Sequence, residues 1–177
     1  NGITLDEKST IKLNGNSQFT GNTALQVKTI NMGSHSLGIG EGIPKVTIAD
    51  TITIDPRNCS ECGLGSGTAD ITFNGQVVVK AGGIGSTGGV VTFGPGSGTS
   101  SFASNTGMDL VDSTLILNTP LNVEWLSLFG ENSSLQTNEN ALTLNEGLKI
   151  GGGPELDFTD IVTDSESELV LAGDATI

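Results

Sequence analysis

The two cysteines are the residues with the clearest chemical potential, and they are spaced as Cys59-Ser-Glu-Cys62. A zinc site needs about four ligands, but the chain has no second cysteine pair and only one histidine, His35, which we expect to be a polar turn residue. A thioredoxin-type redox centre needs a helix that starts at the first cysteine within a βαβ unit, and none is predicted. The spacing therefore favours a local Cys59–Cys62 disulfide in a loop inserted at residues 55–68, and with it an oxidising, extracytoplasmic setting.

Clustered carboxylates form the second candidate site. The densest acidic stretch, Glu155–Glu168, contains Asp157, Asp160 and Asp164. Hard cations bind clustered carboxylate oxygens, so these three aspartates are a candidate calcium site, although their spacing matches neither an EF-hand nor an RTX repeat. The alternative is a solvated acidic surface that opposes aggregation. Calcium is the only cofactor that the sequence suggests.

No group of side chains predicts catalysis. Asp109 and Asp112 could serve as the carboxylate pair of a glycosidase, but they lie among many other acids with nothing to distinguish them. Lyases that act on acidic sugars need cationic groups, and Lys149 is the only basic residue from Asp109 onward. We therefore expect no catalytic residues in this chain.

Trp125 is the only tryptophan, and its indole could be a platform on which a sugar ring stacks. Its neighbours Leu126, Leu128 and Phe129 are apolar, and the chain has no tyrosine. A large aromatic residue with apolar sequence neighbours more often belongs to the core. The sequence therefore favours a buried Trp125, with the sugar platform as the alternative.

The segment Ala81–Gly98 is rich in glycine and carries no charge. A phosphate-binding loop requires Gly-Lys-Ser/Thr and a following helix, and an RTX calcium repeat requires aspartate at the ligand position. Neither requirement is met. The glycines are therefore predicted to occupy corners of the fold at which the backbone needs a positive φ.

The net charge of −13 is unevenly distributed along the chain. Asn1–Met108 has seven acids and six bases, whereas Asp109–Ile177 has thirteen acids and one base. Binding to nucleic acid and to anionic lipid depends on Lys and Arg, so neither is expected as a partner. No run of about 18 apolar residues is present that could insert into a membrane.

An eleven-residue sequence motif repeats along the chain and is clearest at Asn140–Ile150, where two short apolar-x-apolar strands flank a small or polar turn. The first apolar residues of successive copies are separated by 35, 25, 20, 24, 27 and 27 residues. Such a period is the mark of a repeat architecture, and the alternation indicates strands. The fold prediction is an all-β, right-handed parallel β-helix (β-solenoid) with irregular rungs of about 20–27 residues. About seven rungs of about 4.8 Å each would form a rod about 35 Å long.

The clearest strand pair is Lys45–Asp55, in which Val46, Ile48, Ile52 and Ile54 are predicted to face inward and the threonines outward. In the 35-residue interval upstream, Leu25-x-Val27 and Leu37-x-Ile39 compete as an additional strand, and the register there stays open. Residues 1–177 suit one solenoid domain or a segment of a longer one.

These strands and turns, together with Gly33–Gly40, resemble the β-helical passenger regions of bacterial autotransporters and related large surface proteins. Phe19-Thr-Gly-Asn22 and Phe102-Ala-Ser-Asn105 resemble the Phe-x-x-Asn repeats of chlamydial polymorphic membrane proteins, whereas the companion Gly-Gly-Ala-Ile motif is missing. The resemblance implies a surface-exposed or secreted stalk, fibre or adhesive domain, and it carries over no active site.

The leading functional hypothesis is a non-enzymatic, structural or adhesive β-solenoid segment of an extracellular or cell-surface protein. The alternative is a self-assembling filament or surface-layer subunit, and a polysaccharide-active β-helix enzyme is a third possibility. Neither terminus carries a recognisable cap. The end rungs are therefore expected to stack on flanking repeats of a longer chain or on identical copies, and a host surface or a glycan is a further candidate partner.

Overall fold

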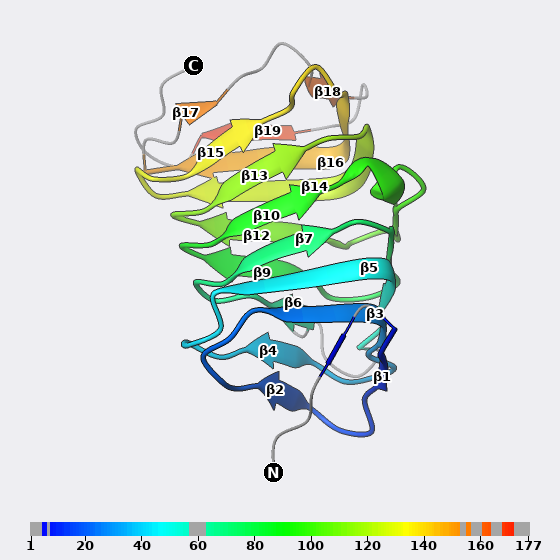
Figure 1. The fold of residues 1–177 in the computed structure, drawn as a ribbon. Coiled ribbons are helices and arrows are strands. Elements are labelled where there is room, and N and C mark those ends of the chain that lie inside the picture. Colours follow the sequence, from blue (N-terminus) through cyan, green and yellow to red (C-terminus); the bar gives the residue numbers. More distant parts are fainter. Residues whose placement is uncertain are drawn as a thin grey trace.

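The computed structural model describes residues 5–6, 8–56 and 63–152, together with the backbone of three strands at 155–156, 161–163 and 168–171. Regular structure in this part of the chain consists of strands and one short 3-10 helix, η1 (Pro95–Ser97). Every strand pairing is parallel. In Figure 1 the front strands run to the right, the rear strands return to the left, and the chain climbs as a right-handed coil of about six turns. The predicted parallel β-helix is confirmed.

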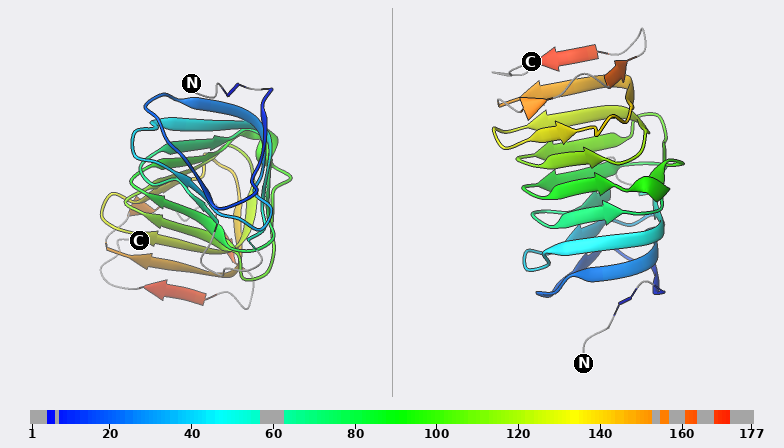
Figure 2. Two further views of the ribbon diagram at one scale, coloured as in Figure 1. Left: turned by 90° about the horizontal axis from the view of Figure 1, so that it is seen from below. Right: turned by 45° about the horizontal axis from the view of Figure 1, so that its top comes forward.

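The strands form three faces of this coil, which surround a common interior when the molecule is viewed along its axis (Figure 2, left). Face 1 is formed by the first halves of two long strands and by five shorter ones: β3 (Leu25–Asn31), β5 (Lys45–Ile54), β7 (Asp70–Phe73), β10 (Val90–Phe93), β13 (Thr114–Leu117), β15 (Ser134–Gln136) and β17 (Glu155–Leu156).

Face 2 follows around the first corner. It contains the second halves of β3 and β5, then the first halves of two further long strands, and four short strands: β1 (Thr10–Lys12), β8 (Gln76–Val79), β11 (Ser101–Phe102), β14 (Leu121–Phe129), β16 (Leu142–Gly151) and β18 (Ile161–Thr163). The hydrogen-bonded ladder breaks between β11 and β14, which nevertheless lie next to each other.

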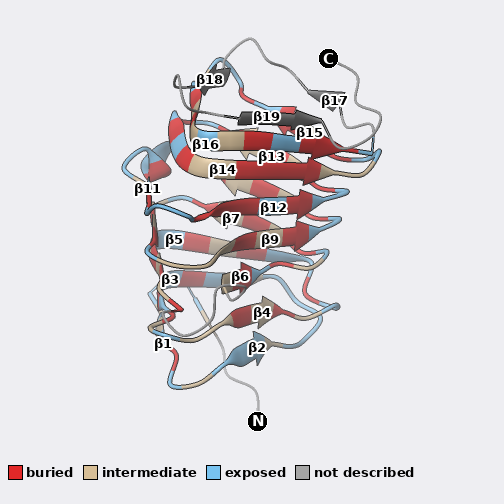
Figure 3. Ribbon diagram, turned by 180° about the vertical axis from the view of Figure 1, so that it is seen from behind, coloured by how far each residue is buried: buried red, intermediate tan, exposed pale blue. Residues whose placement is uncertain are grey.

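Face 3 completes each turn. It contains the second halves of β14 and β16 and six short strands: β2 (Ser17–Phe19), β4 (Leu37–Ile39), β6 (Gly63–Gly65), β9 (Gly83–Thr87), β12 (Gly107–Val111) and β19 (Glu168–Leu171). Figure 3 views this face, on which the strands β4 and β9 alternate buried residues with half-buried or exposed ones. The three faces together explain why one turn needs about twenty residues or more.

The interior is a column of aliphatic and aromatic side chains that alternation along each strand points inward. Val46, Ile48, Ile52 and Ile54 of β5 are each no more than 1% exposed, while the threonines between them are partly exposed, as predicted. Phe73 and Phe93 stack in consecutive turns with ring centroids 5.1 Å apart. Burial of such side chains supplies the main stabilising free energy of the fold.

The rung length on face 1 follows from strand pairing. Its inward residues pair in a single column with separations of 21, 25, 20, 24 and 20 residues: Leu25, Val46, Ile71, Val91, Leu115 and Leu135. The 35-residue interval before Val46 contains an additional turn of the coil, because Leu25-x-Val27 and Leu37-x-Ile39 are both strands, on faces 1 and 3 respectively. The two candidates therefore do not compete.

The repeated sequence motif does not fall on the same face in every turn of the coil. Leu115 and Leu142 begin matching copies of it, but Leu142 pairs with Leu121 on face 2, whereas Leu115 pairs with Leu135 on face 1. All three faces use the same apolar-x-apolar pattern, so similarity between two copies of the motif does not identify the face on which each copy lies. The alignment of these two copies as equivalent rung positions is wrong.

The insert expected at residues 55–68 is shorter than predicted, because Gly63–Gly65 forms β6 on face 3. A Gly-Leu-Gly strand offers only one apolar residue, so sequence alternation could not reveal it. Cys59 and Cys62 lie outside the described residues, and their predicted disulfide stays a prediction.

Buried serines line the corner between faces 3 and 1 in successive turns: Ser66, Ser86, Ser113 and Ser133. Ser113 Oγ lies 3.1 Å from Ser86 Oγ and 2.7 Å from the carbonyl oxygen of Val111, to which it donates. It also accepts a hydrogen bond from the backbone N–H of Gly88 at 2.9 Å. These bonds satisfy polar groups that the tight corner would otherwise bury without partners.

Candidate functional site

The outer side of face 3 differs from the outer side of face 1 in having few side chains. On face 1 the outward positions in three consecutive turns are Thr47, Thr72 and Thr92. On face 3 the outward positions of neighbouring turns are glycines, and they form two columns. The open column is Gly38, Gly65 and Gly85, and the closed column is Gly63, Gly83 and Gly107.

The fold itself requires glycine in the closed column. A Cβ added at Gly63 would collide with the backbone of Gly83, and a Cβ added at Gly83 would lie 2.8 Å from the carbonyl oxygen of Gly107. At Gly107 it would meet the backbone and the indole of Trp125. Close approach between neighbouring strands therefore explains these three glycines.

The open column has no such explanation. A Cβ at Gly65 would meet nothing within 4 Å, and Cβ atoms at Gly38 and Gly85 would make only ordinary contacts of 3.7 and 3.8 Å. None of the three has a φ in the left-handed region. Glycine inside a strand is unfavourable by roughly 0.5–1 kcal/mol relative to alanine. The open column thus carries an energetic cost that neither packing nor backbone geometry requires.

Two glycines of the segment Ala81–Gly98 do occupy corners with positive φ, Gly82 at 68° and Gly88 at 102°, as predicted. Gly83 and Gly85, in contrast, lie within strand β9. The prediction that this segment uses its glycines at corners is therefore right for Gly82 and Gly88 and wrong for Gly83 and Gly85.

Trp125 lies on the outer side of face 3 and is half-buried, so the prediction of a core position is wrong. It pairs with Gly107 and continues the closed column. A Cβ at Gly107 would lie 2.6 Å from Cδ2 of the indole, so the ring packs directly over this glycine. A register irregularity between Val123 and Trp125 turns the chain from face 2 to face 3 and changes which residues point inward.

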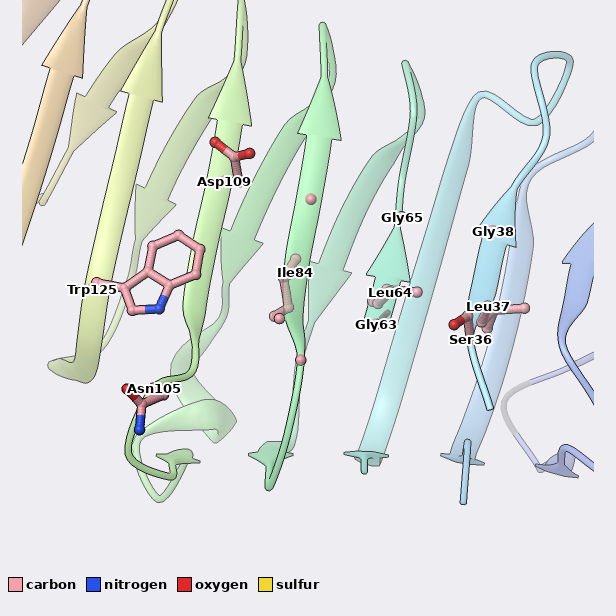
Figure 4. Close-up of a pocket in the computed structure, with 13 residues that line it drawn as sticks. Ser36, Leu37, Gly38, Gly63, Leu64, Gly65, Ile84, Asn105, Asp109 and Trp125 are labelled. Atoms are coloured by element: carbon pink, nitrogen blue, oxygen red, sulfur yellow. The ribbon is translucent and has the colours of Figure 1, made fainter. Parts of the chain in front are cut away.

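The glycines and Trp125 together form a groove with a volume of about 580 Å³. Figure 4 shows the indole reaching from β14 over β12, with Asp109 on β12 to one side and Asn105 on the preceding loop to the other. The open column forms the floor, and its strands β4, β6 and β9 lead away from Trp125. The groove therefore runs across the strands, along the axis of the coil.

Two polar side chains of this groove are available for a ligand. Asp109 and Asn105 are exposed, and within the described part of the chain neither the carboxylate nor the side-chain amide makes a hydrogen bond. The backbone N–H of Asn105 donates to Glu146 Oε1 at 3.0 Å, which fixes the loop at this corner. Asn105 has a left-handed φ of 61°, a conformation that asparagine tolerates better than most residues.

Ser36 lines the groove at the β4 end, opposite Trp125. Its Oγ is buried and, among the residues that the structure describes, is the one buried side-chain oxygen or nitrogen without a hydrogen-bond partner. A buried hydroxyl without a partner costs about 1–3 kcal/mol. Because this Oγ has almost no accessible surface, it belongs to the packing at the start of β4 and is not open to a ligand in the groove.

The remaining candidate residues lie elsewhere. Asp112 does not line the groove with Asp109. It occupies the corner after β12, where its Oδ1 accepts hydrogen bonds of 3.3 Å from the backbone N–H and the side-chain amide of Asn132. His35 lies in the turn between β3 and β4, as predicted. The aspartates of the calcium prediction, Asp157, Asp160 and Asp164, fall outside the described residues, so that prediction is not tested.

Across residues 5–6, 8–56 and 63–152, no three His, Cys, Asp or Glu side chains come together closely enough to hold a metal ion. The same part of the chain contains no helix with the length and apolar character needed to cross a membrane. No protein-family model, curated protein or solved structure matches this chain.

Proposed function

We propose that this chain is a non-enzymatic, adhesive segment of a cell-surface or secreted protein, and that it binds its target through face 3. The observation that carries the proposal is the open column beside Trp125. Three glycines that the fold does not require keep the surface beside the half-buried indole of Trp125 free of side chains. Backbone exposed by glycine allows close approach of a ligand.

A rigid rod suits this role. Each turn buries its inward side chains against the turns on either side, and strand pairing is continuous along faces 1 and 3. Solenoids of this kind present extended surfaces and not deep pockets. The groove crosses several turns, so its geometry depends on the register of strands and is not carried by one loop.

Binding without catalysis fits the groups in the groove. Asp109 is the only carboxylate among its lining residues, whereas glycoside hydrolysis uses two. Asp112, the other member of the pair that the sequence suggested, is held at a corner by Asn132. The acidic net charge of −13 favours a solvated, aggregation-resistant surface, in keeping with an extracellular location.

An adhesion assay tests the proposal. Monomeric protein, checked by light scattering, is coupled to beads and presented to bacterial cells, plant cell-wall material and animal epithelial cells. Two variants introduce the same side chain in one turn of the coil: Gly85→Gln fills the groove floor, and Thr72→Gln alters the outer side of face 1.

We expect wild type and Thr72→Gln to hold the beads on at least one of these surfaces and Gly85→Gln to release them. Adhesion that is the same for all three proteins, or absent for all three, would contradict the proposal. Fibres growing from the pure wild-type protein would instead favour the alternative of a self-assembling filament.

A further inference from the structure

We infer that the groove on face 3 binds an uncharged glycan strand, with one pyranose ring stacked on the indole of Trp125 and the strand lying along the axis of the coil. The inference rests on the proposed adhesive function and names the ligand of the same surface. Four features of the groove carry it: the floor, the indole, the polar groups and the local charge.

The floor admits a flat ligand. Gly38, Gly65 and Gly85 pair in register across β4, β6 and β9, and the same column continues to Asp109 on β12. Three strand spacings of about 4.8 Å make this path about 14 Å long. An extended chain of several sugar rings fits such a path, whereas a single small molecule would leave most of it empty.

The indole supplies the apolar surface. It packs over the backbone at Gly107 and is only half-buried, so part of the ring is open to solvent beside the floor. The C–H face of a pyranose is apolar and flat, and it matches an aromatic ring in shape and polarity. Aromatic side chains of this kind combine a large apolar area with a defined geometry.

The polar groups suit hydroxyls. The Asp109 carboxylate accepts hydrogen bonds, and the Asn105 side-chain amide both donates and accepts them. The two residues flank Trp125, and neither group is engaged by another described residue. A ligand that carries hydroxyls beside its stacked ring would meet both.

The local charge excludes acidic ligands. Asp109 is the one charged residue that lines the groove, and Glu146 lies next to it through its bond to Asn105. Uronic acids, sulfated sugars and nucleic acids would be repelled by these carboxylates. A peptide strand is also disfavoured, because the backbone groups of face 3 are already paired within the ladder. An uncharged glycan is the remaining polymer with the required chemistry.

Titration with soluble oligosaccharides tests the inference. The neutral probes are cello-, xylo-, manno- and N-acetylated chito-oligosaccharides from disaccharide to hexasaccharide, and oligogalacturonates are the acidic comparison. Trp125 is the only tryptophan, so any change in tryptophan fluorescence reports on the groove. Calorimetry measures the affinity of variants that lack the indole.

We expect at least one neutral series to bind, with affinity that rises with chain length, and the oligogalacturonates not to bind. Trp125→Ala should weaken binding at least tenfold, and Trp125→Phe should recover part of the loss. Gly65→Thr with Gly85→Thr should also abolish binding. These two positions have room for side chains, so this variant keeps its fold even if Trp125→Ala does not, as circular dichroism would confirm. Thr72→Gln on face 1 is the control and should bind like wild type.

The inference is overturned if no neutral series binds, if binding survives both groove variants, or if oligogalacturonates bind as well as neutral sugars. Beads that adhere through face 3 while no neutral sugar binds would remove the glycan and leave the adhesive function standing. Beads that fail to adhere, together with sugars that fail to bind, would remove both.

Discussion

Gly63 and Gly65 lie two residues apart on β6 and face the same side of the sheet, but their surroundings are opposite. An added methyl group at Gly63 meets the backbone of the next strand, whereas one at Gly65 meets open space. The same residue type therefore has a structural cause at one position and none at the other. This contrast at a single added carbon separates the glycines of face 3 that the fold requires from those that it does not require.

A matched pair of substitutions tests this contrast. Gly63→Ala should lower the free energy of unfolding by about 1–3 kcal/mol, because the backbone has to move to relieve the clash. Gly65→Ala should raise it by about 0.5–1 kcal/mol, because it restricts the unfolded chain and creates no clash. Urea unfolding followed by circular dichroism measures both. Equal effects of the two substitutions would contradict the distinction.

The cysteines give a second prediction at this scale. We expect Cys59 and Cys62 to be joined in the native protein, since the spacing suits a local disulfide better than zinc or thioredoxin-type chemistry. Intact-mass measurement after alkylation, with and without prior reduction, decides the matter. Alkylation of both cysteines without reductant would remove the disulfide and its argument for an oxidising compartment.

The sequence predicted the inward residues of β5 correctly but assigned Trp125 to the wrong side. Val123 and Leu126 both point into the core. If the strand alternated regularly from Val123, Trp125 would also point inward, but as the neighbour of Leu126 it points outward. The irregularity between Val123 and Trp125 interrupts the regular alternation. Ser127 and Phe129 lie on the same side of the strand as Trp125. The polar Ser127 was the signal in the sequence that could have revealed the outward position of Trp125.

At the scale of strands and corners, the three faces repeat one pattern with different outer surfaces. In the middle turns, threonine occupies the outer side of face 1 and glycine that of face 3, although the inward residues of both faces are mainly apolar. Hydrophobic periodicity identifies strands and their approximate spacing. It does not say on which face a strand lies, because the core side of every face looks alike. This is why the fold class could be predicted from the sequence, whereas the face on which each copy of the repeated motif lies could not.

The buried serines at the corner between faces 3 and 1 are expected to stabilise the folded state. Ser113→Ala removes a hydroxyl that bonds to Gly88, Val111 and Ser86 at a buried corner. We expect the free energy of unfolding to fall by about 1–3 kcal/mol, because buried polar groups lose a partner. The exposed Ser104 provides the control, and Ser104→Ala should change stability by less than about 0.5 kcal/mol. Equal melting curves for the two variants would show that the corner bonds contribute nothing.

The acidic segment provides the prediction about calcium. If Asp157, Asp160 and Asp164 share a cation, the melting temperature should rise with Ca²⁺ and fall back with EDTA, because a ligand that binds only the folded state stabilises it. A variant with all three aspartates changed to asparagine should lose this response. Calorimetric titration that detects no heat, together with an unchanged melting temperature, would leave only a solvated acidic surface.

At the scale of the whole molecule, the groove results from pairing between distant segments. Gly38, Gly65 and Gly85 are 27 and 20 residues apart in the chain, and only the register of β4, β6 and β9 brings them into one column. Trp125 joins them from a further turn through β12. A single sequence contains no signal for this column until the irregular rung lengths are known. The solenoid was thus predictable from the sequence, and the groove on face 3 was not.

We propose that face 3 is the surface through which the rod binds its target. Hydroxyl-radical footprinting of the protein, free and attached to the surface that retains the beads, tests it directly. We predict that attachment lowers the oxidation of Trp125 on face 3 while leaving Ile116, which lies in the outward column of face 1, as reactive as in the free protein. Unchanged oxidation of Trp125, or protection of Ile116 to the same degree, would contradict the claim.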